Sequence, residues 1–141
     1  HGLGVKKVAV TLMQPLGCLS RSSMFYSFQK CNETENSYVT FNNHLLLQAV
    51  AKLNKQTEDS PFVILDLNHA FKTVFANKES SKFVNILKPC SQGIRPEFQC
   101  GFVDPKGVKK YTICENPEST FFWDCDHRTQ GAWHAVYLAL R

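Results

Sequence analysis

The sequence has no long apolar run, no strong excess of one charge and no repeated or low-complexity segment. A membrane-spanning helix needs about 18 or more consecutive apolar residues, so the sequence predicts no transmembrane segment. The 16 Lys and Arg residues only slightly outnumber the 12 Asp and Glu residues, and they are paired only at Lys6-Lys7 and Lys109-Lys110. Such scattered positive charge does not predict nucleic acid as a partner.

What is present fits one ordinary globular domain. The chain has 141 residues, of which 43% are hydrophobic and 20% charged, and this length is sufficient to bury a sizeable core. We therefore expect a single domain over residues 1–141. Because the chain begins with His1 rather than Met and lacks a signal-peptide pattern, we also expect it to be processed or truncated.

Six cysteines in a chain of this size favour an oxidising compartment, and hence a secreted protein. Six cysteines allow about 15 pairings, among which sequence does not choose. The short loop between Cys18 and Cys31 favours that pair. The unassigned cysteines are Cys90, Cys100 and Cys114, which are further disulfide candidates, and Cys125.

Asn32 is a candidate site of N-glycosylation. It opens the triplet Asn32-Glu33-Thr34 directly after Cys31, although such triplets also arise by chance. A glycan at Asn32 would fit the secretory pathway that the cysteines indicate.

The first half of the chain predicts alternating strands and helices. Residues 6–12 and 61–67 are short apolar runs typical of strands. Residues 38–53 predict a helix, with an apolar stripe that recurs every three or four positions: Tyr38, Phe41, Leu45, Ala49 and Leu53. A second helix follows the second strand, with Asn68 as its expected N-cap and one apolar face formed by Phe71, Val74 and Phe75.

This order predicts an α/β fold with parallel strands and a crossover helix. Two strands alone do not form a sheet covered on both faces, so we expect the chain to be part of a larger sheet with strands supplied from elsewhere. Residues 88–117 predict a long disulfide-pinned loop with one strand at 111–114, and residues 132–140 predict a last helix.

Asp124 and His127 are the candidate catalytic residues, in a turn that leads into the last helix. At this spacing a carboxylate can accept the imidazole Nδ1 proton and stabilise the cation that forms when Nε2 takes a proton. The spacing alone also fits a surface Asp that caps a turn, and that alternative stays open.

Other candidate sites are weaker. Cys125, Asp126 and His127 are too crowded to converge on one metal ion, so no metal and no cofactor is expected. His44 and His134 are expected to be packing or surface residues. The aromatic residues near the end of the chain are expected in the core or in a pocket wall: Phe121, Phe122, Trp123 and Trp133.

Short motifs along nearly the whole chain resemble the later blocks of plant GDSL-type esterase/lipases. They are residues 4–11 (GVKKVAVT), 15–19 (PLGCL), Cys31, 42–46 (NNHLL), 62–67 (FVILDL), 88–90 (KPC), Gly93, 100–101 (CG), 111–114 (YTIC), 122–124 (FWD), His127 and Thr129. So many elements in family order are more specific than any one motif, and they identify the chain as similar to roughly the C-terminal half of that family.

The resemblance implies a partial three-layer α/β/α hydrolase fold of the SGNH type that cleaves carboxylic esters or lipids through a serine acyl-enzyme. Asp124 and His127 match the catalytic Asp and His of that family. The serine block Gly-Asp-Ser and the family's oxyanion Gly and Asn do not occur in the sequence. Arg128 stands where the family usually has Pro, and Cys90-Ser91 stands where many relatives have adjacent cysteines.

Two functions follow. In the first, the chain supplies the Asp and His of an ester hydrolase whose serine-bearing N-terminal half belongs to the same protein or to a second chain. In the second, it is a truncated, catalytically inactive secreted relative that acts as a binding or interaction protein. The retained Asp124 and His127 favour the first function, whereas the missing serine block favours the second.

Overall fold

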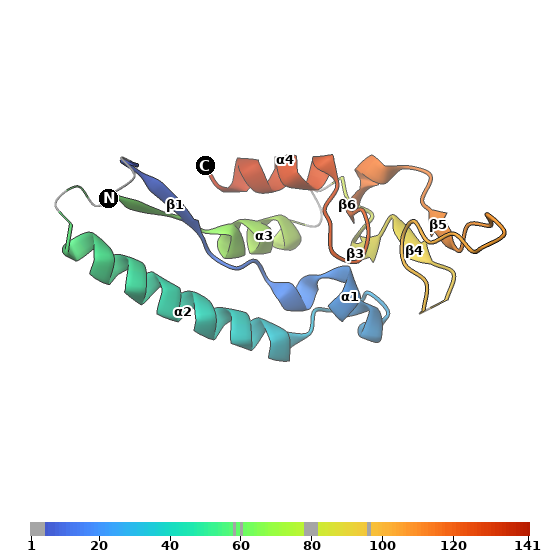
Figure 1. Cartoon of the computed structure of the whole chain (residues 1–141), viewed down its shortest axis with the longest axis horizontal. Coiled ribbons are helices and arrows are strands. Elements are labelled where there is room, and N and C mark those ends of the chain that lie inside the picture. The colour runs from blue at the N-terminus through green and yellow to red at the C-terminus, as the bar shows by residue number, and fades with distance from the viewer. Residues whose placement is uncertain (1–4, 58, 60, 78–81, 96) are drawn as a thin grey trace.

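The computed structural model of the chain describes residues 5–57, 59, 61–77, 82–95 and 97–141, so His1 lies outside them. The elements in chain order are β1 (Val8–Thr11), η1 (Leu16–Cys18), α1 (Ser20–Ser23), η2 (Met24–Tyr26), α2 (Glu33–Lys55), β2 (Phe62–Leu65), α3 (Leu67–Ala76), β3 (Asn85–Pro89), β4 (Ser91–Gly93), β5 (Tyr111–Ile113), η3 (Pro117–Ser119), β6 (Thr120–Phe122) and α4 (Gln130–Ala139). Figure 1 shows α2 along one side of an elongated molecule, with α3 and α4 packed against each other on the other side. Among the described residues, no helix is long and apolar enough to cross a membrane.

The predicted parallel pairing of the first two strands is confirmed. Strand β1 pairs with β2 in parallel, from Val8 opposite Phe62 to Thr11 opposite Leu65, and α2 makes the connection between them. The chain is thus an α/β structure, as the alternation of strands and helices predicts.

The sequence analysis did not predict a second parallel pair, β3 with β6, which forms a two-stranded sheet separate from that of β1 and β2. Within the described residues the β1-β2 sheet has two strands, and the strands expected from elsewhere remain a prediction. Strand β3 contains Lys88 and Pro89 and β6 has only three residues, so neither forms a recognisable apolar run. The predicted loop 88–117 is also partly wrong, since β4 pairs antiparallel with β5 inside it.

Helix α2 begins at Glu33, five residues before the predicted start at 38. The side chain of Asn32 caps it, because its Oδ1 accepts the backbone N–H groups of Thr34 and Glu35 at 3.1 and 3.2 Å. An N-cap amide satisfies backbone donors that otherwise have no partner in the helix. The capping role was not predicted.

The predicted apolar face of α2 is not the face that packs against the rest of the chain. Tyr38 and Phe41 remain 69% and 65% exposed, and Leu45 and Leu53 are exposed too. The packed face includes Val39, Asn43 and Val50, all of which are buried. At about 3.6 residues per turn, this face is rotated by roughly a third of a turn from the predicted stripe.

Three asparagines on this packed face attach α2 to the rest of the chain through hydrogen bonds to backbone groups. Asn43 accepts from the N–H of Met13 and donates to its carbonyl, both at 2.8 Å. Asn54 makes the same pair of bonds with Phe62, at 3.0 and 2.8 Å. Asn36 accepts from the N–H of Gly17 at 3.0 Å. These amides hold α2 against the ends of β1 and β2, which explains why a polar stripe lies inside.

The N-cap of α3 is Asp66, not Asn68 as predicted. Helix α3 begins at Leu67, so the cap position falls on Asp66, whose Oδ1 accepts the N–H of His69 at 2.8 Å. Asn68 lies in the first turn and donates instead to the Met13 carbonyl at 3.0 Å.

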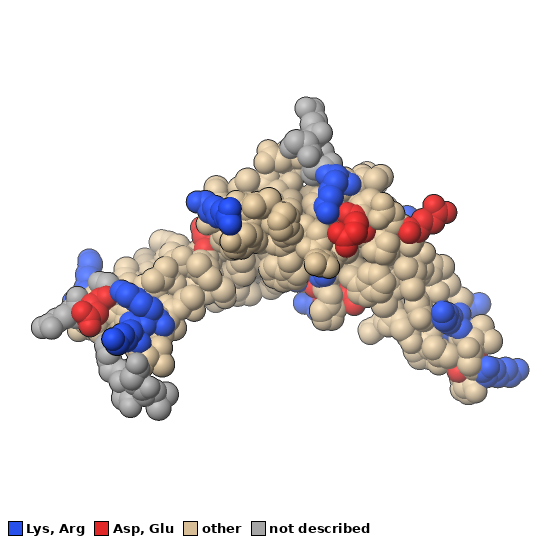
Figure 2. Space-filling model, turned by 90° about the horizontal axis from the view of Figure 1, so that it is seen from above, with Lys and Arg blue, Asp and Glu red and all other residues tan. Residues whose placement is uncertain are grey.

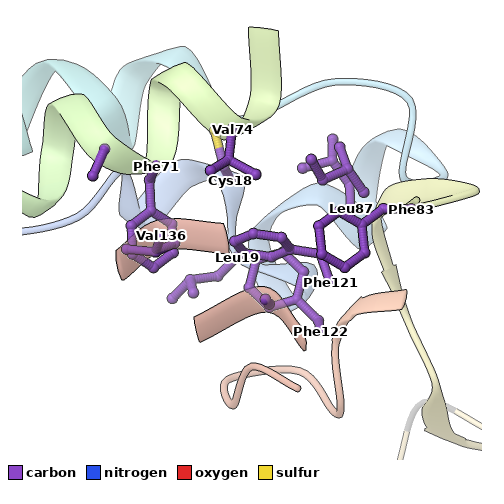
Figure 3. Close-up of a cluster of buried hydrophobic side chains, with 12 residues drawn as sticks. Cys18, Leu19, Phe71, Val74, Phe83, Leu87, Phe121, Phe122 and Val136 are labelled. Atoms are coloured by element: carbon purple, nitrogen blue, oxygen red, sulfur yellow. The ribbon is translucent and has the colours of Figure 1, made fainter. Parts of the chain in front are cut away.

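The main core lies between α3, α4 and β6 (Figure 3). Phe121 and Phe122 of β6 are 0% and 1% exposed, and the rings of Phe71 and Phe121 meet edge to face at 5.6 Å. Thr129 caps α4 by accepting the Ala132 N–H at 3.1 Å, and its hydroxyl donates to the Thr120 carbonyl at 2.8 Å. The core therefore fixes the chain on both sides of residues 123–128.

Two disulfides are present, Cys18–Cys31 and Cys90–Cys114. The second joins the residue between β3 and β4 to the residue after β5, and the N–H of Cys114 also donates to the Cys90 carbonyl at 2.8 Å. Cys100, a predicted disulfide candidate, is a free thiol, as is Cys125. The reason is that strand pairing brings Cys114 to Cys90 and leaves Cys100 in the loop between β4 and β5.

Candidate functional site: an Asp-His pair after strand β6

The candidate site is a tight turn that leaves the carboxyl end of β6 and returns to the start of α4. The N–H of Trp123 donates to the His127 carbonyl at 2.8 Å, and a bridge joins Phe122 to Arg128. The N–H of Thr129 donates to the Phe121 carbonyl at 3.0 Å. Open α/β sheets bind ligands at the carboxyl ends of their strands, which is where this turn lies.

Within the turn, Asp124 holds the imidazole ring of His127. Its Oδ2 and Oδ1 lie 2.9 and 3.0 Å from His127 Nδ1. Oδ1 also accepts the backbone N–H groups of Asp126 and His127, at 2.9 and 2.7 Å. Asp124 therefore caps the turn, as the alternative reading of its spacing predicted, and the same carboxylate also binds the His127 ring.

These contacts set the charge of Asp124 and the tautomer of His127. Partial burial is the largest influence on Asp124 and opposes its ionisation, but the N–H groups of His127 and Asp126 and the His127 ring outweigh it, so the pKa of the carboxyl is lowered. An ionised carboxylate only accepts hydrogen bonds, so Nδ1 carries the proton. In a neutral imidazole ring with this tautomer, the lone pair lies on Nε2, as a general base requires.

The pair borders a cavity of about 590 Å³. The side chain of His127 is 78% exposed and that of Asp124 only 20%. Three segments line the cavity: residues 21–28, residues 89–100 and the turn itself. The lining residues are Arg21, Met24, Phe28, Pro89, Gln92, Gly93, Ile94, Arg95, Phe98, Gln99, Cys100, Asp124, Cys125, Asp126 and His127. The exposed imidazole thus lies in the wall of a cavity large enough to admit a small molecule.

Arg128 lies under the turn rather than beside the imidazole. Its guanidinium stands 5.1, 5.5 and 5.7 Å from the rings of Phe71, Phe122 and Trp133, and its Nη1 donates to the Asp126 carbonyl at 2.7 Å. Burial lowers the pKa of Arg128 to about 10, although Asp126 and Asp124 counter the effect. Stacking on aromatic faces lets the cation remain charged and support the turn from below.

The other predicted candidates lie outside this pair. His44 is exposed on α2, with its Nε2 3.0 Å from Gln48 Nε2, and His134 is exposed on α4 beside a separate cavity of about 550 Å³. Trp123 is partly buried and Trp133 is 45% exposed. Among the described residues, no group of His, Cys, Asp or Glu has the arrangement to hold a metal ion.

Arg21 is a residue of the site that the sequence did not indicate. Its Nη1 lies 3.2 Å from Asp126 Oδ1, and its backbone N–H donates to the Cys125 carbonyl at 3.2 Å. It thereby ties α1 to the turn. No local pattern marks this contact, since the two segments lie at opposite ends of the chain.

The described residues hold no serine hydroxyl that is hydrogen-bonded to the His127 ring. Ser91 lies beside the turn, with its N–H donating to the Trp123 carbonyl at 2.6 Å, but it is 0% exposed and its Oγ has no hydrogen-bond partner. A buried hydroxyl is not available to a substrate. The part of the chain that the structure describes therefore shows an Asp-His pair with no serine hydroxyl bonded to it.

Sequence comparisons with known proteins relate the chain to one family. No protein-family model matches the chain. A GDSL esterase/lipase of Arabidopsis thaliana is 54% identical over 145 residues, covering 100% of this chain but 40% of that protein. A second GDSL esterase/lipase of the same plant is 48% identical over 144 residues, with 99% and 41% covered. The anther-specific proline-rich protein APG of this plant is 29% identical over 141 residues, with 99% and 25% covered.

The chain thus spans about 40% of the length of the first two relatives. The resemblance predicted from the sequence is confirmed, and the chain is related over its whole length to the plant GDSL esterase/lipases.

Proposed function

We propose that this chain supplies the general base and its orienting acid to a serine hydrolase that acts on carboxylic esters or lipids. The observation that carries the proposal is the 2.9 Å contact between Asp124 and His127 Nδ1 in a turn at the carboxyl end of β6. The relatives named GDSL esterase/lipases support ester chemistry. The nucleophilic serine is proposed to come from the part of the protein that corresponds to the remaining length of these relatives.

The proposed steps follow from which atoms are free. His127 Nε2 removes the proton of the serine hydroxyl as the serine attacks the ester carbonyl, and it then gives this proton to the departing alcohol. In the second half, Nε2 takes a proton from the water that cleaves the acyl-enzyme. Asp124 stays ionised throughout, holds the ring through Nδ1 and stabilises the imidazolium. Arg128 and Arg21 keep the turn in place but do not contact the imidazole.

The exposed stripe of α2 is where we propose that the serine-bearing portion packs. Leu45 and Leu53 continue the stripe begun by Tyr38 and Phe41, and a helix with apolar residues on two faces is typical of burial from both sides. Figure 2 views the molecule from above, the side opposite α2, and shows its bent outline with Lys and Arg residues at both ends. The proposed packing surface is the α2 stripe on the other side. Packing there would complete a three-layer SGNH domain, of which residues 1–141 form the C-terminal portion.

Secretion and glycosylation belong to the same proposal. The two disulfides fit an oxidising compartment. Asn32 is partly exposed at the start of α2, and its Nδ2 lies 3.0 Å from Glu35 Oε1. In protein secreted from plant cells, Asn32→Gln should remove one glycan, seen as a loss of mass that corresponds to a single N-glycan. No such loss in that variant would contradict glycosylation at this site.

The test uses the full-length protein and a chromogenic short-chain ester. We expect His127→Ala to lower kcat by at least three orders of magnitude, because Nε2 has no replacement as base. The matched control is His134→Ala, which removes an exposed histidine of α4 outside the cavity and should leave kcat within a factor of about two. Equal activity of both variants would remove His127 from the mechanism. A wild-type protein without ester hydrolysis would instead favour the inactive binding relative.

A further inference from the structure

We propose that Cys100 and Cys125 form a third disulfide, which joins the loop between β4 and β5 to the turn that carries Asp124 and His127. The bond would form whether or not the protein hydrolyses esters. Its test is therefore separate from that of the proposed function.

The two residues are the thiols that remain once the other disulfides are made. Cys18–Cys31 and Cys90–Cys114 are paired, and Cys100 and Cys125 are free. Both free cysteines are partly exposed and both line the cavity of about 590 Å³. Two segments that are distant in the sequence thus each place a free cysteine in the lining of one cavity.

Cys100 is placed by a turn of defined geometry. The N–H of Phe102 donates to the Gln99 carbonyl at 3.1 Å, and Gly101 has a φ of +84°, so Cys100 and Gly101 are the central residues of a turn of type II. The rings of Phe98 and Phe102 stack at 4.9 Å across this turn. Cys100 is thus held at the cavity by a hydrogen-bonded turn.

Cys125 is held in the facing wall, where its carbonyl accepts the Arg21 N–H at 3.2 Å. Burial is the main reason why the pKa of its thiol is raised, and negative charge on Asp126, Asp124 and Cys100 adds to the effect. The influence of Cys100 on this pKa agrees with the placement of both cysteines in the lining of the same cavity. Free thiols so placed are expected to oxidise together in a compartment where the other cysteines are paired.

The reaction is thiol–disulfide exchange with a small disulfide, such as glutathione disulfide, as oxidant. The sulfur of Cys100 attacks it, forms a mixed disulfide and releases one glutathione thiol. Cys125, which its surroundings keep protonated until this point, then loses its proton to solvent, and its sulfur attacks Cys100 Sγ and releases the second glutathione thiol. The two cysteine sulfurs are oxidised, and the glutathione disulfide is reduced to two thiols.

The experiment equilibrates the full-length protein in glutathione buffers of increasing oxidation and blocks free thiols with N-ethylmaleimide. Non-reducing digestion and mass spectrometry then map the bonds. We expect blocking at Cys100 and at Cys125 to fall from complete to none, and we expect a peptide that links these two cysteines. Cys100→Ser should leave Cys125 blocked at every oxidation level, and Cys125→Ser should do the same for Cys100, with both other disulfides intact as the control for folding.

Three results would overturn the proposal. The first is that both thiols remain blocked by the reagent under conditions in which Cys18–Cys31 and Cys90–Cys114 are oxidised. The second is a stable glutathione adduct on either cysteine in place of the linking peptide. The third is a link from Cys100 or Cys125 to a second molecule, seen as a reducible dimer.

Discussion

Asp124 both caps the turn and holds the His127 ring, and replacing it by Asn tests these two roles separately. The Asn Oδ1 can still accept the N–H groups of Asp126 and His127, which the carboxylate binds at 2.9 and 2.7 Å. Its Nδ2, however, would bring a donor to His127 Nδ1, which also carries a proton. The pair can be restored only if the ring shifts its proton to Nε2, and this tautomer is not a base at the atom that the substrate meets.

The expected loss of kcat is about four orders of magnitude, the size found when the orienting Asp of a serine hydrolase becomes Asn. That loss corresponds to about 5.5 kcal/mol of transition-state stabilisation. The free energy of unfolding should change by less than about 1 kcal/mol, since the turn keeps its backbone hydrogen bonds. Asp124→Ala should lose similar activity but also about 1 kcal/mol or more of stability, because both N–H groups lose their acceptor.

Two assays on the full-length protein test these roles of Asp124. One measures kcat for a chromogenic short-chain ester, and the other measures urea unfolding by circular dichroism. The reasoning predicts that Asn and Ala variants are alike in kcat and differ in stability. If the Asn variant keeps activity within tenfold of the wild type, Asp124 does not set the tautomer of His127 and the proposed roles are wrong.

Three further predictions concern the stability of the same protein. The pKa of Asp124 is lowered in the folded state, so the ionised carboxylate stabilises the fold fully above the ordinary carboxyl pKa range. This stabilisation is lost as the pH falls through the lowered pKa, so the urea midpoints of wild type and Asp124→Asn should converge at acid pH. A difference between the midpoints that stays constant with pH would contradict this. Asn43→Ala should lower the free energy of unfolding by about 1–3 kcal/mol, because its two hydrogen bonds of 2.8 Å to the Met13 backbone are lost, whereas Lys52→Ala on the exposed side of α2 should change it little. Equal urea midpoints for the two variants would show that Asn43 does not hold α2 in place. Phe121→Ala should cost about 3–5 kcal/mol, since this ring is 0% exposed among other aromatic rings, and a cost below about 1 kcal/mol in the same assay would contradict its central place in the core.

The first half of the fold was predictable because its elements have a clear periodicity. The apolar runs of β1 and β2 and the long repeat of α2 gave the parallel pair and its crossover helix. Strands β3 and β6 were not predictable, since they are short and β3 contains Pro89. Their pairing depends on contacts between segments that are distant in the sequence.

The face of α2 shows a limit of hydrophobic patterning. The stripe through Tyr38 and Phe41 is apolar but exposed, whereas Asn43 is buried because its amide replaces a backbone partner for Met13. Periodicity counts apolar residues and does not detect an amide that binds a neighbouring chain segment. For the candidate site, the contact between Asp124 and His127 was predictable because it is local. The Arg21 contact and the stacking of Arg128 depend on the tertiary fold.

The most direct test of the central claim is labelling of the full-length protein with a fluorophosphonate probe, followed by identification of the modified residue. Such probes react with a serine that a base has activated. The account predicts that wild type and His134→Ala are labelled at one serine outside residues 5–141, at equal rates, and that His127→Ala is labelled at least a hundredfold more slowly. No labelling of the wild type, or labelling that His127→Ala leaves unchanged, would contradict it.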